Sequence, residues 1–263
     1  MKYSMVFGAT GGLGKIYCEK LAKSGENLYL SGRNAEKLQL LKNALETKYR
    51  GVSVRIYPCD LTRSEEREKL YSDFLSESGA EISGLYYAAG ADIQKAFSKY
   101  TEEKIVLQAR VNFEAALSAT RFALERRNGA LKILIVSSLC GITPMPYFAE
   151  YAATKAALIS FYTALRYELK GTDTAITVVA PGSVPTRKDI IEDIKKQGLQ
   201  GKLSSVKPEK VVEKSLRALK KNKRTCVSGF YNNSVRFFSK LSPAGLSCRI
   251  IAKKFSKKEK DAF

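Results

Sequence analysis

Two kinds of segment alternate along the first two-thirds of the chain. Short runs are rich in β-branched or aromatic residues, and longer stretches have apolar residues at helical spacing. The short runs predict strands at residues 3–7, 27–31, 53–57, 84–88, 132–137 and 174–179. The longer stretches predict helices at residues 13–24, 35–49, 64–77, 102–127 and 151–170. Strands separated by helix-length segments are typical of βαβ units. The pattern therefore predicts an α/β fold with a doubly wound parallel sheet flanked by helices.

The regular alternation ends near Pro181, and the chain beyond it is interrupted by glycines and prolines. A chain of 263 residues is long enough for one domain with a full core. We therefore predict one main domain over residues 1–230 and an extension over residues 231–263.

Composition excludes several classes of protein. No apolar stretch approaches the ~20 residues of a membrane span, and the first strand runs directly into a glycine-rich turn, so no signal peptide is expected. Five scattered cysteines without a Cys-x-x-Cys pair favour a reducing compartment, which predicts a cytoplasmic protein. The chain has no histidine, so histidine bases and histidine-containing zinc sites are excluded, and we predict no metal site.

A glycine-rich turn, Gly8-Ala9-Thr10-Gly11-Gly12-Leu13-Gly14, follows the first predicted strand and opens the first predicted helix. Small residues there allow the backbone to approach a pyrophosphate at the helix N-terminus. A tight turn that binds nothing is the alternative. The position within a βαβ unit favours the dinucleotide site.

Two further residues bear on the nucleotide. Arg33 follows the second predicted strand, where an NAD site would carry an acidic residue; a guanidinium there favours the 2′-phosphate of NADP(H). The alternative is a solvated loop arginine. Asp60 follows the third predicted strand and is a candidate to contact adenine, to cap a helix over residues 62–75, or to do both.

Candidate acid–base chemistry comes from Tyr151 and Lys155, which are four residues apart on one helical face. An ammonium beside a phenol stabilises the phenolate, so we expect Lys155 to lower the pKa of Tyr151 from its usual ~10. Ser138 ends a strand thirteen residues before Tyr151, at the edge of the sheet where ligands bind. Tyr-x-x-x-Lys alone arises easily by chance; its combination with Ser138 and the glycine turn does not.

These residues resemble the compact single-domain short-chain dehydrogenases/reductases over roughly the first 190 residues. The matching motifs are Gly8-x-x-x-Gly12-x-Gly14, Asp60-Leu61, Ala89-Gly90, Val111-Asn112, Ser137-Ser138, Tyr151-x-x-x-Lys155 and Pro181-Gly182-x-x-x-Thr186. The resemblance implies a Rossmann-type sheet, a nicotinamide cofactor, a homodimer or homotetramer, and hydride transfer between nicotinamide and a carbonyl or alcohol. With Arg33, it predicts an NADP(H)-preferring carbonyl reductase, with NAD(H) possible as coenzyme.

The resemblance also implies residue roles. Tyr151 would exchange a proton with the substrate oxygen and Ser138 would orient that oxygen. Lys155 would bond the nicotinamide ribose, and Asn112 would hold a water that links Lys155 to solvent. The implied cofactor contacts are Gly8, Thr10, Gly11, Gly12, Leu13, Gly14, Arg33, Asp60, Leu61, Ala89, Gly90, Asn112, Tyr151, Lys155, Pro181, Gly182, Val184 and Thr186.

The chain departs from the family pattern at two places. It has Tyr87-Ala88 where the family has Asn-Asn, which removes hydrogen bonds expected to brace the sheet and the cofactor backbone. It has Gly11 where many NADPH-using members place a basic residue. Arg33 therefore carries the predicted coenzyme preference almost alone.

Apolar residues flank the candidate catalytic groups and predict a pocket for an apolar carbonyl or alcohol, although the same residues could belong to the core. They are Leu139, Cys140, Ile142, Met145, Phe148, Val184 and Pro185. Residues 187–206 lie where family members carry a mobile lid.

The last segment is strongly basic: residues 200–263 hold 17 lysines and arginines against four acidic residues, a net charge of +13. Basic residues mixed with large apolar ones favour peripheral contact with an anionic membrane. The alternative is a segment that closes the pocket or a subunit interface and ends in a solvated lysine run. No nucleic-acid partner is expected, because no recognised binding module accompanies the charge.

Two rival functions remain at this stage. A non-catalytic nucleotide-binding regulator or scaffold could keep the fold, but it would have no physical need for Tyr151 and Lys155 together. An epimerase or dehydratase would resemble longer chains with a larger substrate domain.

Overall fold

One parallel sheet of seven strands organises the computed structural model, which describes residues 1–239 and 241–256 and the backbone of residues 260–261. The strand order is β3-β2-β1-β4-β6-β7-β8. The strands are β1 (Lys2–Phe7), β2 (Asn27–Gly32), β3 (Val54–Pro58), β4 (Glu81–Tyr87), β6 (Arg127–Val136), β7 (Thr174–Val179) and β8 (Thr225–Cys226). The six predicted strands and the doubly wound parallel sheet are confirmed. The two-residue β8 is too short to produce a sequence pattern, and we did not predict it.

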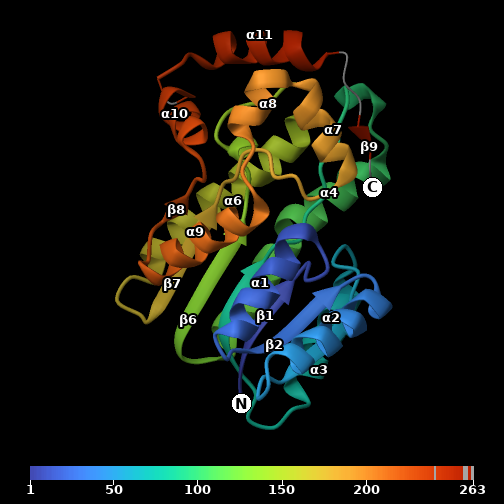
Figure 1. Ribbon diagram of the computed structural model, residues 1–263, viewed down its shortest axis with the longest axis vertical. Coiled ribbons are helices and arrows are strands. Elements are labelled where there is room, and N and C mark those ends of the chain that lie inside the picture. Colours follow the sequence, from blue (N-terminus) through green and yellow to red (C-terminus); the bar gives the residue numbers. More distant parts are fainter. Residues whose placement is uncertain (240, 257–259, 262–263) are drawn as a thin grey trace.

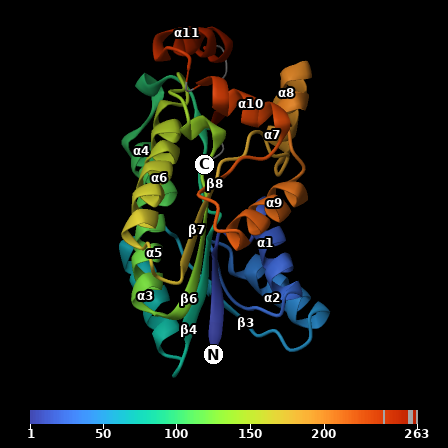
Figure 2. The same ribbon diagram turned by 90° about the vertical axis from the view of Figure 1, so that its left-hand side faces the viewer.

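Helices cover both faces of the sheet (Figure 2). One face carries α1 (Gly12–Lys23), α2 (Ala35–Lys48) and α9 (Pro208–Lys220). The other carries α3 (Ser64–Leu75), α4 (Glu102–Ala109), α5 (Ala115–Glu125) and α6 (Ala149–Glu168). The strands point toward the end of the molecule that holds α7 (Lys188–Lys196), α8 (Gly198–Ser204), α10 (Phe230–Ser239) and α11 (Ala244–Phe255) (Figure 1). A two-stranded antiparallel pair, β5 (Ile93–Gln94) with β9 (Lys260–Asp261), completes the described strands.

The hydrophobic core lies in two layers, one on each face of the sheet. In β1, Tyr3, Met5 and Phe7 belong to one layer and Val6 to the other. Because helices cover both faces, five of the six β1 residues are buried. This explains why the central strands are apolar without alternation.

The prediction of one helix over residues 102–127 is wrong. The helix is interrupted after α4 by a π-helical turn, Arg110–Glu114, and resumes as α5, while Arg127 already begins β6. The turn carries the fully buried Asn112, whose side chain bonds the backbone of Ala91. Local widening of a helix of this kind is frequent at functional sites.

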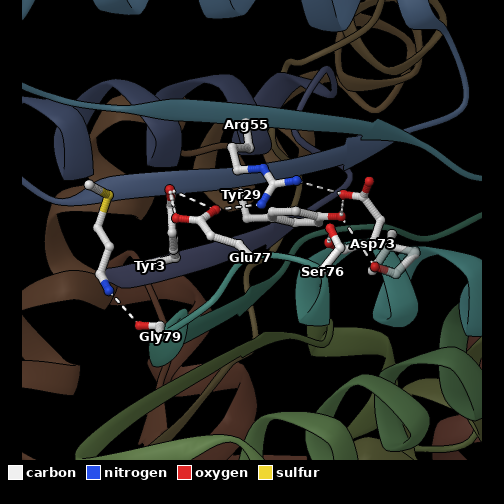
Figure 3. Close-up of polar contacts among 9 residues, drawn as sticks. Tyr3, Tyr29, Arg55, Asp73, Ser76, Glu77 and Gly79 are labelled. Atoms are coloured by element: carbon white, nitrogen blue, oxygen red, sulfur yellow. Dashed lines mark hydrogen bonds and ion pairs between the residues drawn. The ribbon is translucent and has the colours of Figure 1, made fainter.

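A cluster of hydrogen bonds and ion pairs connects α3 and the residues after it to the first three strands (Figure 3). Arg55 of β3 forms ion pairs with Asp73 and Glu77. The same two carboxylates accept hydrogen bonds from the hydroxyls of Tyr29 (2.7 Å) and Tyr3 (2.9 Å). Because all the donors come from strands and both acceptors from the α3 segment, the cluster fixes that segment against the sheet.

The carboxyl-terminal helices α10 and α11 lie near the carboxyl ends of the strands (Figure 1). Among the residues that the structure describes, no helix combines the length and the apolar character needed to cross a bilayer. The predicted extension, residues 231–263, also contains residues 240, 257–259 and 262–263, which lie outside the described residues.

Candidate active site

The glycine turn between β1 and α1 is built by close backbone approach. The N–H groups of Gly8 and Ala9 both donate to the carbonyl of Ser31 at 3.0 Å, which ties the turn to the end of β2. Gly8 has a φ of +75°, a conformation that favours glycine. A methyl group on Gly14 would lie 2.0 Å from the oxygen of Gly8. Only glycine lets α1 start this close to the strand, as the predicted pyrophosphate turn requires.

The segment that follows β7 lies directly against this turn. A methyl group on Gly12 would lie 2.4 Å from Cβ of Thr186. A methyl group on Gly182 would lie 2.6 Å from the amide nitrogen of Asn232, a buried α10 side chain that we did not predict. The structure thus brings together the segment predicted to contact the pyrophosphate and the segment predicted to contact the nicotinamide end of the cofactor, and Asn232 supports the second of them.

The predicted nucleotide contacts lie at the same edge of the sheet. Arg33 directly follows β2 and is exposed, and no described residue forms a hydrogen bond or ion pair with its side chain. The hydroxyl of Thr10 would be 3.2 Å from a methyl group on Gly32. Leu13 is partly buried against the core, and Leu61 is a buried core residue.

Asp60 shapes a turn instead of capping a helix. Its carboxylate accepts hydrogen bonds from the N–H (3.0 Å) and the hydroxyl (2.8 Å) of Thr62. The helix starts later, at Ser64, with Arg63 as its N-cap residue and no side-chain cap. The predicted cap over residues 62–75 is therefore wrong, because Asp60 bonds the loop before the helix. Its contact with adenine stays a prediction.

The candidate catalytic groups converge beside the ends of β4 and β6. The ammonium of Lys155 lies 5.7 Å from the ring centroid of Tyr151 and donates to the carbonyl of Val136 at 3.1 Å. The side chain of Ser138 lies beside Tyr151 and favours its phenolate, and the Ser138 hydroxyl oxygen accepts the N–H of Cys140 at 3.1 Å. Helix α6 thus supplies the tyrosine and lysine, and the β6 end supplies the serine.

Asn112 and Lys155 meet at Gly90. A methyl group on Gly90 would lie 3.0 Å from the amide oxygen of Asn112 and 3.2 Å from the ammonium of Lys155. The Asn112 amide bonds both the N–H (2.8 Å) and the carbonyl (2.9 Å) of Ala91, and it donates to the hydroxyl of Thr154. These bonds fix the loop after β4, and the water predicted at Asn112 stays a prediction.

The family's missing asparagines have a substitute that we did not predict. Tyr87 is fully buried, and its hydroxyl donates to the carbonyl of Val111 at 2.7 Å. This bond joins the end of β4 to the residue just before Asn112. A tyrosine therefore braces the site where the family uses asparagine.

Burial controls the charges at the site. It raises the pKa of Tyr151 above its ordinary value, and Cys140 and Asp92 add to that effect, while the nearby Ser138 side chain and the charge of Arg187 oppose it. This direction is opposite to the one predicted from Lys155. Burial also lowers the pKa of Lys155 to about 8, because its ammonium is removed from water. Desolvation is therefore stronger at both groups than their mutual attraction.

An ion pair that we did not predict spans the two loops beside the site. Arg187, which follows Thr186, donates to the carboxylate of Asp92 at 2.7 Å. Asp92 is the last residue of the loop between β4 and β5. Arg187 also bonds Asp189. The pair links the start of the predicted lid to the catalytic side of the sheet.

The predicted pocket residues divide between core and site. Val184 is buried in the core layer that contains Val179, and its assignment to the pocket and to the cofactor stays a prediction. Phe148 lies 5.8 Å from Tyr151 and 5.9 Å from Phe255, ring centroid to centroid. Helix α11 therefore closes over the aromatic wall beside Tyr151. The other predicted lining residues stay a prediction.

The residues present fit a nicotinamide dinucleotide. Gly8, Gly12 and Gly90 let the segments around the site approach closely, because an added methyl group would meet the backbone of Ala89, the side chain of Thr186, and the side chains of Asn112 and Lys155, respectively. The N-terminus of α1 has no acidic residue in its first turn, so a pyrophosphate there would meet no like charge.

Comparisons with known proteins agree with this geometry. The family model for the short chain dehydrogenase matches residues 2–195. A 3-oxoacyl-[acyl-carrier-protein] reductase of Rickettsia felis is 29% identical over 215 residues, which cover 81% of this chain and 80% of that protein. A 7beta-hydroxysteroid dehydrogenase of Clostridium sardiniense is 29% identical over 189 residues, 70% of each chain.

Solved structures share the fold. A 7beta-hydroxysteroid dehydrogenase superposes with a TM-score of 0.81 at 24% identity, covering 95% of this chain and 96% of that one. A short-chain dehydrogenase from Sphingobium yanoikuyae, in complex with NADPH, superposes with a TM-score of 0.76 at 20% identity over 100% of both chains. Because the family model spans most of the sequence, the chain belongs to the short-chain dehydrogenase/reductase family of oxidoreductases.

Proposed function

We propose that the chain is an NADP(H)-preferring oxidoreductase that acts on an apolar ketone, aldehyde or secondary alcohol, with Tyr151 as the acid–base group. The observation that carries the proposal is the convergence of Ser138, Tyr151 and Lys155 beside the glycine turn. NADPH-bound proteins occur among the structural neighbours, and a steroid dehydrogenase among the relatives acts on an apolar substrate class.

The bound nicotinamide would supply or accept the hydride, held by the glycine turn, Thr186 and Lys155. During reduction, Tyr151 donates its phenolic proton to the carbonyl oxygen of the substrate, and it takes the proton back during oxidation. Ser138 is fixed by the N–H of Cys140 and orients the same oxygen by a hydrogen bond. The Lys155 ammonium stabilises the phenolate that forms when Tyr151 gives up its proton.

The activity is tested by following NADPH and NADH absorbance while the protein meets a panel of apolar ketones and aldehydes, and by the reverse assay with alcohols. We expect consumption of NADPH in preference to NADH. Binding of coenzyme without turnover in either direction would favour the non-catalytic regulator instead.

Replacing Arg33 tests the coenzyme preference. We expect Arg33→Ala to lower the ratio of kcat/KM for NADPH to that for NADH about 10- to 100-fold, because one or two charge-assisted hydrogen bonds to the 2′-phosphate are lost. Steady-state kinetics with both coenzymes measure the ratio. Arg50→Ala is the control, because Arg50 is exposed at the other end of α2. An unchanged ratio in Arg33→Ala would mean that Arg33 is a solvated loop residue.

For partners, we propose a homodimer or homotetramer and a peripheral contact of residues 231–263 with anionic membranes. Support for the membrane contact comes from exposed apolar side chains on and after α10, with Phe237 62% and Phe238 64% exposed. Arg249 and Lys253 are exposed on α11 and carry the charge that an anionic surface attracts. Sedimentation of the purified protein measures the oligomeric state, and the cytoplasmic location stays a prediction.

Vesicle binding tests the membrane contact. We expect Phe237→Ser/Phe238→Ser to weaken binding to anionic vesicles at least about tenfold, since two aromatic rings no longer leave water. Leu40→Ser is the control, because Leu40 is 69% exposed on α2. Point substitutions are preferable to truncation, because Phe255 packs on Phe148 beside the site. Equal binding of wild type and double variant would contradict the contact.

A further inference from the structure

A cavity of about 250 Å³ adjoins the first turn of α6, at the residues that precede Tyr151. Its wall is mostly aromatic and aliphatic, with contributions from the segment around η1 (Phe97–Lys99), from the residues before α6 and from α11. Tyr147, in this wall, has a φ of +66°, a left-handed conformation that is costly for a residue other than glycine. Strained residues of this kind cluster at ligand sites.

One carboxylate belongs to this wall. Glu150 directly precedes Tyr151 in α6, and both of its carboxylate oxygens are buried and have no hydrogen-bond partner among the residues that the structure describes. Burial raises its pKa to about 7. Glu150 lies in the first turn of α6, where the helix dipole favours a carboxylate, but it accepts no hydrogen bond from a backbone N–H of the described residues. A buried carboxyl without a partner lowers stability, and a ligand group that donates a hydrogen bond to it would remove that cost.

The rest of the wall limits what that ligand group can be. Phe97, Tyr100 and Tyr147 favour an apolar molecule. Lys95 lines the same cavity, and its ammonium lies 5.5 Å from the ring centroid of Tyr100. A cationic group would lose far more hydration than a hydroxyl on entering this mostly apolar cavity. The group that complements Glu150 is therefore a neutral hydrogen-bond donor on an otherwise apolar ligand.

We propose that Glu150 determines substrate specificity by accepting a hydrogen bond from a neutral hydroxyl, remote from the reacting carbonyl, on an otherwise apolar substrate. This inference rests on the proposed function, because it places that substrate's far end in the cavity. Tyr151 lies next to Glu150 in sequence but does not line the cavity. One side chain thus handles the reacting oxygen and its neighbour recognises the remote hydroxyl.

The test uses methyl ketones of increasing chain length, each with a terminal methyl, methoxy, hydroxyl or ammonium group. NADPH-dependent kcat/KM is measured above the pKa of Glu150 for the wild type, Glu150→Gln, Glu150→Leu and the control Glu168→Leu, an exposed position at the far end of α6. At one chain length we expect the wild type to prefer the hydroxyl over the methyl and methoxy ketones at least about tenfold. Glu150→Leu should lose the preference, while Glu150→Gln, with its amide oxygen, and Glu168→Leu should keep it.

Thermal unfolding separates recognition from a structural role. If Glu150 serves a ligand, Glu150→Leu should melt several degrees above the wild type without ligand, because an unpaired buried carboxyl is removed. A lower Tm would assign Glu150 to stability instead. An ammonium or methoxy ketone that matches the hydroxyl ketone, or a preference that survives in Glu150→Leu, would also overturn the proposal.

Calorimetric titration of the same ketones keeps this inference distinct from the proposed function. If no ketone is turned over but the hydroxyl ketone binds the wild type at least about tenfold more tightly than Glu150→Leu, the reductase proposal fails and the recognition by Glu150 stands. If ketones are reduced at rates that do not depend on the terminal group, the reductase proposal stands and the recognition by Glu150 fails.

Discussion

Tyr151→Phe is expected to lower kcat about 10²- to 10⁴-fold, the range that one positioned acid–base group contributes. The substitution removes only the hydroxyl. The ring keeps its contacts with Phe148 and with the Lys155 ammonium, so folding and coenzyme binding should change little. Steady-state NADPH oxidation with the best carbonyl of the panel measures the loss, and fluorescence of bound NADPH measures the affinity for coenzyme.

Tyr162→Phe is the matched control for this prediction. Tyr162 is another buried tyrosine of α6, bonded to the hydroxyl of Thr120 far from the site. Its variant should lose about 1 kcal/mol of stability and keep its turnover. Wild-type turnover in Tyr151→Phe would show that another group exchanges the proton.

Lys155→Met is expected to abolish efficient turnover and to raise the free energy of unfolding of the coenzyme-free protein by about 2 kcal/mol at neutral pH. Lys155 is only 4% exposed, and burial lowers its pKa to about 8 from 10.5. Holding the ammonium in the folded protein therefore costs stability, and the hydrogen bond to the carbonyl of Val136 returns only part of it. Methionine fills a similar volume without the charge.

The difference in stability between Lys155→Met and the wild type should depend on pH. Between about pH 8 and 10.5 the unfolded chain keeps the Lys155 proton and the folded chain does not, so unfolding takes up a proton. The stability of the wild type therefore rises with pH through that window relative to the variant, and the advantage of Lys155→Met should shrink toward zero. Urea unfolding across this range measures both proteins, with Lys170→Met, at an exposed position, as control. A pH-independent difference would contradict the buried ammonium.

Prediction from the sequence anticipated the placement of the candidate site residues where one element carries the whole pattern. The glycine turn and the Tyr151–Lys155 pair each depend on spacing within a few residues, and the structure brings both to the same edge of the sheet. It failed where long-range contacts decide. Asn112 lies in a π-helical turn that periodicity does not reveal, because the extra residue is held by bonds to Ala91 across the loop.

The prediction of pKa values from the sequence meets the same limit. The sequence places an ammonium beside a phenol, which by itself predicts a lowered pKa for Tyr151. Only the tertiary structure shows how deeply both groups are buried, and desolvation reverses the direction. The unpaired carboxylate of Glu150 was missed for this reason, since a glutamate in the first turn of a helix gives no sign of burial in its sequence.

Local periodicity and motifs of fixed spacing were enough to predict the six long strands, most of the helices between them, the parallel sheet and the membership of the family. The tertiary structure alone decided which distant residues support the site. Tyr87 braces the turn that carries Asn112, Arg187 pairs with Asp92, and Phe255 closes over Phe148. Each of these contacts joins separate segments of the chain, and their proximity depends on how the layers pack rather than on any pattern within one segment.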